Sequence, residues 1–116
     1  MSTRIKQGNP EQTCCSIVSF VVPAYNVDGI ISHCINSLFE RVEEYAGECE
    51  VIVVDDGSED YTYEMAWSTI NLNRKQYPRF RGRVIRHSAK LGEAEAIKTG
   101  MNKALGQIIV VDPNTV

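Results

Sequence analysis

Four short apolar runs, separated by segments with helical spacing, constrain the fold more than any other feature of this sequence. Three of them are almost continuous and rich in β-branched residues, at 16–22, 50–54 and 107–111. Continuous apolar strands are expected where both faces of a sheet are covered. The remaining run, at 83–87, is more polar, which is typical of an edge strand. The sequence therefore predicts three covered strands and one strand at the edge.

The segments between these runs have the spacing of amphipathic helices, at residues 28–46, 60–75 and 93–105. The positions that carry this spacing are Ile31, Cys34, Ile35, Leu38, Phe39 and Val42 in the first, Met65, Ala66, Thr69, Ile70 and Leu72 in the second, and Ala94, Ala96, Ile97, Met101 and Leu105 in the third. The order is β-α-β-α-β-α-β. This alternation predicts a three-layer α/β/α fold with a mainly parallel, four-stranded, Rossmann-like sheet.

Size and composition indicate one ordinary globular domain. The chain has 116 residues and a formal net charge of −3, without a basic stripe, so nucleic acid is not an expected partner. Residues 1–13 are polar and lack the apolar core of a signal peptide, so we expect a flexible arm there and a domain over 14–116. No apolar run approaches the roughly 20 residues that cross a bilayer.

The cysteines indicate a reducing compartment. Their positions are Cys14, Cys15, Cys34 and Cys49. They form no CxxC pair, and with His33 and His87 they match no zinc spacing, so free thiols are expected. Free thiols without an export signal favour a cytoplasmic location.

Polar segments follow three of the predicted strands, at residues 23–26, 55–58 and 112–114. In open parallel sheets, ligands bind beyond the carboxyl ends of the strands, where the strand order reverses. We therefore expect these three segments to meet at one edge of the sheet and to form the candidate site.

The second of these segments contains the adjacent carboxylates Asp55 and Asp56, which repel each other and have no neighbouring cation in the sequence. Gly57 permits a sharp turn, and Ser58 or Asp60 can cap the next helix. One reading is that a carboxylate here binds a ligand. The other is that both aspartates are turn and cap residues only.

The other two segments have the same two readings, as binding residues or as plain turns. Pro23 cannot extend a central strand, so we expect the chain to leave the sheet there. Tyr25 could stack on a nucleobase, and Asn26 could contact a ribose or cap a helix. Asp112 and Asn114 could ligate a divalent cation, Mn²⁺ or Mg²⁺, that bridges two phosphates.

Lys90 stands just before the third helix, where a helix N-terminus also favours anions, so it could face a phosphate. His33 and His87 are expected to be structural rather than catalytic, because partners for catalysis are missing. Neither GxGxxG, nor GxxxxGK[ST], nor GxSxG occurs, which disfavours dinucleotide-binding, P-loop and serine-hydrolase readings.

Together these segments resemble the family 2 glycosyltransferases, whose fold is of the GT-A type. The resemblance covers about residues 16–116 and rests on VSFVVPAYN at 18–26, EVIVVDDGSED at 50–60, RVIRH at 83–87 with Leu91-Gly92, and the stretch from Thr99 to Asp112. It implies a truncated GT-A domain that binds a nucleoside diphosphate sugar and a divalent metal. Carried over by motif, Pro23, Ala24 and Tyr25 would line the nucleoside pocket, and Asp55 or Asp56 would contact the base or ribose. The expected donor-binding residues also include Asn26, Ser58 and Lys90, of which Lys90 lies near the family's nucleotide contact but outside a defined motif.

Two departures from the family pattern qualify this function. The family's DxD metal motif reads Asp112-Pro113-Asn114, and losing the second acid should weaken metal binding. The family's acceptor pocket and catalytic base belong to a second half, so no catalytic residue is assigned here and activity is expected to need that half. The alternative is a non-catalytic binding or oligomerisation module derived from a glycosyltransferase, with a second copy or a complementing chain as its partner.

Overall fold

The computed structural model describes residues 17–43 and 48–115, and these form four parallel strands and three helices. The elements are β1 (Ile17–Ala24), α1 (Ile31–Val42), β2 (Glu48–Asp55), α2 (Thr62–Gln76), β3 (Arg81–Arg86), α3 (Glu93–Lys103), β4 (Gln107–Val110) and the short 3₁₀ helix η2 (Pro113–Thr115). The strand order is β3-β2-β1-β4. The predicted α/β class, element order and parallel sheet are confirmed.

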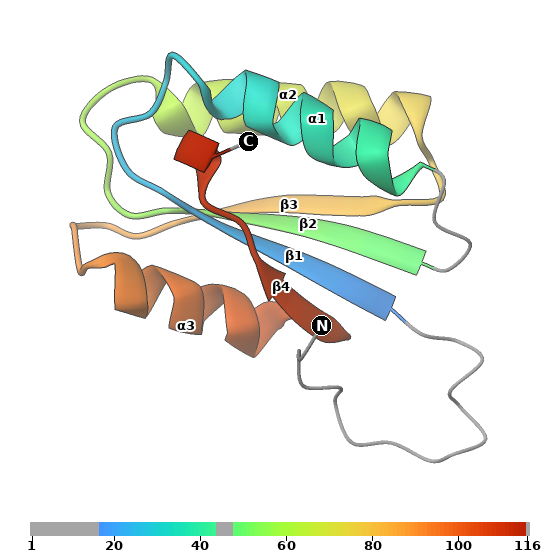
Figure 1. Cartoon of the computed structure of the whole chain (residues 1–116). Helices are drawn as coiled ribbons and strands as arrows, with labels where there is room; N and C mark the ends of the chain where they lie inside the picture. The colour runs from blue at the N-terminus through green and yellow to red at the C-terminus, as the bar shows by residue number, and fades with distance from the viewer. Residues whose placement is uncertain (1–16, 44–47, 116) are drawn as a thin grey trace.

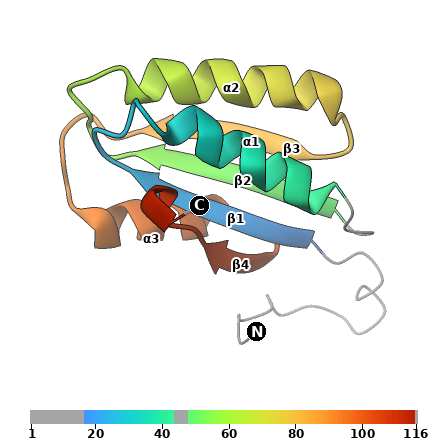
Figure 2. The same ribbon diagram turned by 45° about the horizontal axis from the view of Figure 1, so that its top comes forward.

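The sheet lies between two helical layers. Helices α1 and α2 cover one face and α3 covers the other, as Figure 1 and the rotated view in Figure 2 show. The larger core cluster lies between the sheet and the α1–α2 layer, and a smaller one of Ile52, Val54, Ala96 and Ala104 lies beneath α3. All six positions predicted for the apolar stripe of α1 are buried.

The contact faces of α2 and α3 match the predicted stripes only in part. Ala66, Thr69, Ile70 and Ala96 are buried as predicted, but the other buried positions are small or polar residues. Met65, Leu72, Met101 and Leu105 are exposed, whereas Thr62, Asn73 and Gly100 are buried. On α2, the Asn73 amide donates to Asn36 Oδ1 at 2.8 Å, so polar groups join α2 to α1. On α3, Ala96 and Gly100 face the sheet, and Gly100 approaches Val21 so closely that a Cβ would lie 2.4 Å from its Cγ1.

Pro23 does not end the first strand, contrary to expectation. It belongs to β1, which has β2 and β4 on its two sides, and it pairs in register with Val54. The Val21 carbonyl accepts from the Val111 N–H, so it points toward the β4 side. Backbone groups two residues apart point the same way. The missing N–H of Pro23 therefore falls on the side where β4 has ended at Val110, and no ladder bond is lost.

The prediction for one outer strand is confirmed and that for the other is wrong. The polar run became β3 at one edge, as predicted. The apolar run at 107–111 was expected to be covered on both faces, but β4 forms the other edge of the described sheet and Val110 is 45% exposed. All four residues of β4 pair with β1, and no described strand lies on the other side of β4.

Cys34 and Cys49 are free and buried thiols, as expected. Burial raises the pKa of each to about 11, so both are unreactive at neutral pH. The predicted flexible arm, Cys14, Cys15 and the rest of residues 1–16 lie outside the described residues. Among the helices that the structure describes, none combines the length and apolarity needed to cross a membrane.

Candidate functional site

The adjacent aspartates at the end of β2 make hydrogen bonds to different segments of the chain. The Asp55 carboxylate is fully buried. Its Oδ1 accepts from the Ser58 N–H at 3.2 Å and also from the Ser58 hydroxyl. Gly57, with φ of 75°, makes the turn that this contact requires, as predicted. Asp55 therefore closes the turn that follows β2.

The same turn is braced against the end of β1. The Asn26 N–H donates to the Ser58 hydroxyl at 2.8 Å, and Asn26 Oδ1 accepts from the Glu59 N–H at 2.9 Å. Asp60 Oδ1 accepts from the Thr62 N–H at 2.9 Å in the turn before α2, but the cap position of that helix is Tyr61, which makes no side-chain cap bond, so neither Ser58 nor Asp60 caps the helix as predicted. Asn26, Ser58 and Asp55 thus hold the two strand ends together.

Asp56 connects the end of β2 to the segment before α3. Its Oδ1 accepts from the Leu91 N–H at 2.9 Å and lies 2.8 Å from His87 Nδ1, and its Oδ2 accepts from the Gly92 N–H at 2.9 Å. Burial alone raises the pKa of Asp56, but these N–H groups and His87 outweigh it and hold the pKa below its ordinary value. His87 Nε2 lies 2.8 Å from the Thr99 hydroxyl, so the histidine also joins α3.

The basic side chains that contact the two carboxylates come from the end of β3. Arg86 Nε lies 3.4 Å from Asp55 Oδ2, and His87 contacts Asp56. The register places Asp55 opposite Arg86. The sequence shows no cation near the pair along the chain, because these partners are about thirty residues away. Through these contacts, His87 joins the end of β2 to α3.

A cavity of about 310 Å³ opens at the carboxyl ends of β1 and β2. Seven residues predicted for the site line it, namely Pro23, Ala24, Tyr25, Asp56, Lys90, Asp112 and Asn114. The side chains of Asn26, Asp55 and Ser58 are not part of the lining and brace the turn behind it. The lining also contains Val27, Glu93, Ala96 and Pro113. The three polar segments after the strands thus meet at one edge, which is the arrangement that the sequence predicts.

The residues that sequence reasoning missed carry little chemical signal. Val27 and Ala96 are ordinary apolar residues, and only their position beside the strand ends brings them to the cavity. Ala96 could have been found from its place on the first turns of α3, one turn after Gly92.

The electrostatics of the cavity are dominated by acids. Asp56, Glu93 and Asp112 contribute carboxylates, and Lys90 is the cation among the residues that line it. The Lys90 ammonium lies 4.2 Å from the centre of the Tyr25 ring, a cation–π contact that holds it at the cavity. A diphosphate entering such a cavity would meet net repulsion unless a further cation accompanied it.

Asp112 and Asn114 offer oxygen ligands for such a cation. They share the cavity wall, and Asp112 Oδ1 accepts from the Asn114 N–H at 2.9 Å. No group of three His, Cys, Asp or Glu residues suited to a metal occurs within residues 17–43 and 48–115. The donor set therefore fits Mn²⁺ or Mg²⁺ held partly by phosphate oxygens, since these ions bind through one or two carboxylates plus substrate phosphates.

Comparison with known proteins places the chain in a family. The family model described as "Glycosyl transferase family 2" matches residues 19–111. The chain belongs to this family. This family 2 domain is 33% identical over 94 residues to the uncharacterized glycosyltransferase EpsJ of Bacillus subtilis strain 168, across 80% of this chain and 24% of EpsJ.

Solved glycosyltransferases share the GT-A fold of this domain. The mannosyltransferase PcManGT of Pyrobaculum calidifontis, in complex with GDP-Man and Mn²⁺, superposes with a TM-score of 0.66 at 24% identity over 84% of this chain and 27% of PcManGT. S. aureus TarS 1–349 in complex with UDP superposes with a TM-score of 0.63 at 26% identity over 84% of this chain and 27% of TarS 1–349. The family 2 domain thus spans about a quarter of the length of these relatives.

Proposed function

We propose that this family 2 domain binds the nucleoside diphosphate sugar donor in the cavity at the carboxyl ends of β1 and β2. The observation that carries the proposal is the convergence of three strand-end segments and Lys90 on one cavity of about 310 Å³. That volume lies at the lower end of the range for small-molecule sites. The related PcManGT and TarS, solved with GDP-Man and UDP, support the ligand class.

Residues that line the cavity would contact the donor directly. Pro23, Ala24 and Tyr25 would form the nucleoside wall, and Asp56 would accept hydrogen bonds from the base or ribose. Lys90 would face the diphosphate. Asn26, Asp55 and Ser58, which the sequence pattern also implicates, would act through the turn that they brace, because their side chains lie behind the lining.

A divalent cation would complete the site. Asp112 and Asn114 would hold it together with the donor diphosphate, and when bound it would neutralise charge on the leaving diphosphate. The three cavity carboxylates make this requirement stronger here than in a basic pocket. PcManGT was solved with Mn²⁺, which supports the choice of ion.

Glycosyl transfer would need groups from outside this chain. In the family mechanism, a carboxylate base deprotonates the acceptor hydroxyl. We assign this base to a region that corresponds to the unmatched three quarters of relatives such as EpsJ. The expected cytoplasmic location stays a prediction.

The first test is direct binding. Calorimetry of the 116-residue chain with UDP and with GDP, in the presence of Mn²⁺, should give heat with a Kd in the millimolar range or tighter for one of the two. Lys90→Ala should weaken binding several-fold because a cation near the diphosphate is lost, whereas Lys98→Ala, which lies outside the cavity lining, should not. Absence of heat with both nucleotides at millimolar concentration would count against donor binding.

The second test concerns the cation. Asp112→Asn removes the negative charge from the cavity wall and preserves its size. We expect the enhancement of nucleotide affinity by Mn²⁺ to fall about tenfold, while affinity measured in EDTA stays level or rises as repulsion is relieved. An Mn²⁺ enhancement that survives the substitution would show that the ion is held elsewhere.

A further inference from the structure

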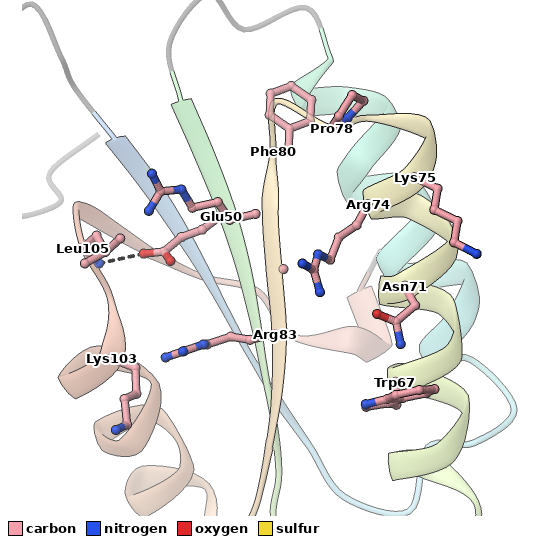
Figure 3. A pocket seen from close by; sticks show the side chains of 12 residues that line it. Glu50, Trp67, Asn71, Arg74, Lys75, Pro78, Phe80, Arg83, Lys103 and Leu105 are labelled. Carbon is pink, nitrogen blue, oxygen red and sulfur yellow. Dashed lines mark hydrogen bonds between the residues drawn. The ribbon is translucent and has the colours of Figure 1, made fainter.

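A second and larger concavity lies along the open edge of the sheet, away from the strand-end cavity. It has a volume of about 980 Å³ and shares no lining residue with that cavity. We call it the β3 groove. Figure 3 shows its two walls on either side of β3: Trp67, Asn71 and Arg74 project from α2, and Arg83, Lys103 and Leu105 lie toward α3.

The charge of the β3 groove is opposite to that of the whole chain. Its lining contains Arg74, Lys75, Arg81, Arg83 and Lys103, which are five of the twelve Lys and Arg residues, in a chain of net charge −3. Glu50 is the carboxylate of the lining, and its Oε2 already accepts from the Ser19 hydroxyl and the Leu105 N–H. Arg81 lies 3.8 Å from Glu48 in an exposed pair. The groove thus presents a cationic surface suited to an acidic occupant.

The floor of the groove is a strand edge. Among the described strands, β3 pairs only with β2. The His87 N–H donates to the Asp55 carbonyl on the β2 side. By alternation, Gly82 and Val84 direct their N–H and C=O groups away from β2, toward the open edge. A polypeptide strand satisfies such a row of donors and acceptors, whereas a phosphate polymer or a lipid surface does not.

A second copy of this chain is a poor occupant. In an edge-to-edge pair related by two-fold symmetry, each β3 would face the other, and Arg81 and Arg83 would meet arginines of the second copy. An acidic strand would instead place carboxylates against them. We infer that the β3 groove binds an extended acidic segment of another polypeptide, which adds to β3 as a fifth strand.

The alternation of a strand also predicts the pattern of this partner. Side chains of the added strand would point alternately to the two walls. Those on the α3 side would meet Arg83 and Lys103 and should be acidic. Those on the α2 side would meet Trp67, which is 56% exposed, and Arg74 farther along the helix, so an apolar residue fits beside Trp67 and an acidic one beside Arg74. Over about the six residues of β3, the expected partner is therefore acidic where it faces α3 and apolar where it faces Trp67.

The test uses a fluorescein-labelled six-residue peptide of alternating glutamate and valine, matched in length to β3, and the 116-residue chain. Fluorescence anisotropy should show saturable binding. The same peptide with alternate backbone nitrogens methylated keeps its charge but loses the edge facing β3, and should bind about tenfold more weakly or not at all. Equal binding of the methylated peptide would overturn strand addition.

Two substitutions test whether binding depends on the charge of the groove itself, and lipid vesicles test the alternative of a membrane surface. Arg83→Glu should weaken peptide binding about tenfold, whereas Lys98→Glu, an equal charge change outside the groove, should leave it within about twofold. Equal losses in both variants would indicate attraction by net charge alone and overturn the proposal. Binding to phosphatidylserine vesicles without binding to the peptide would overturn it in favour of a membrane surface.

Discussion

Replacing Gly106 with alanine is expected to lower the free energy of unfolding by about 3 kcal/mol or more, which is large for the addition of one methyl group. A Cβ at this position would lie 2.0 Å from the carbonyl oxygen of Ile17 and 2.5 Å from its carbonyl carbon. These are backbone atoms of β1, so no side-chain rotation relieves the overlap. Moving the chain away would also break the bond from the Gly106 N–H to Ser19 Oγ, 3.1 Å long.

Gly29→Ala is the matched control, because a Cβ there would meet no atom within 4 Å. Urea unfolding of the two variants beside the unsubstituted chain measures the difference. We expect the control to stay within about 0.5 kcal/mol of the unsubstituted chain. If Gly106→Ala unfolded at the same urea concentration as the control, the close approach of residue 106 to β1 would be wrong.

Replacing Asp56 with asparagine is expected to cost about 2–4 kcal/mol at neutral pH and to abolish measurable nucleotide binding. The carboxylate accepts from two backbone N–H groups and contacts His87, and hydrogen bonds to a charged group contribute about 1.5–3 kcal/mol each. An asparagine amide would turn an N–H donor toward one of these donors. The segment before α3, with Lys90, should then lose its anchor to β2.

The cost of this substitution should depend on pH in a defined direction. The pKa of Asp56 is held below its ordinary value of 3.8 in the folded chain. Its ionised form therefore contributes stability that is fully present above about pH 4–5 and is lost as the pH falls through the lower folded value. The gap in unfolding free energy between Asp56→Asn and the unsubstituted chain should therefore shrink as the pH falls from 5 toward 3.

Glu59→Gln, at an exposed position in the same turn, is the control for this pH series. Its unfolding free energy should follow that of the unsubstituted chain throughout. A gap for Asp56→Asn that stays the same at pH 3 and pH 7 would mean that the carboxylate charge is not what these hydrogen bonds stabilise.

Much of the fold follows from residue patterns that report on local geometry. The stripe of α1 is readable because its six positions are apolar and recur with the period of a helix. The contact face of α3 is not, because the sheet lies so close that glycine and alanine fit best, and small residues give no apolar signal. Pro23 misleads for a similar reason: whether a missing N–H matters depends on where the neighbouring strand ends.

The candidate site likewise has features that local sequence patterns predict and features that they do not. The strand-end rule correctly predicts that the polar segments meet at one edge of the sheet, but it does not predict the different partners of Asp55 and Asp56. That distinction depends on Arg86 and His87, which reach the pair only through the register of β3. Strand register is a property of packing between distant segments, so no local motif encodes it.

The brace between Asn26, Asp55, Ser58 and Glu59 joins the ends of two strands through hydrogen bonds within the chain itself. A donor arriving at this rim would meet walls that are already assembled. Little conformational freedom would then be surrendered on binding, and most of the contact energy would appear as affinity. Lys90 is exposed and contacts the face of the Tyr25 ring, so it is already held at the cavity where a phosphate would arrive.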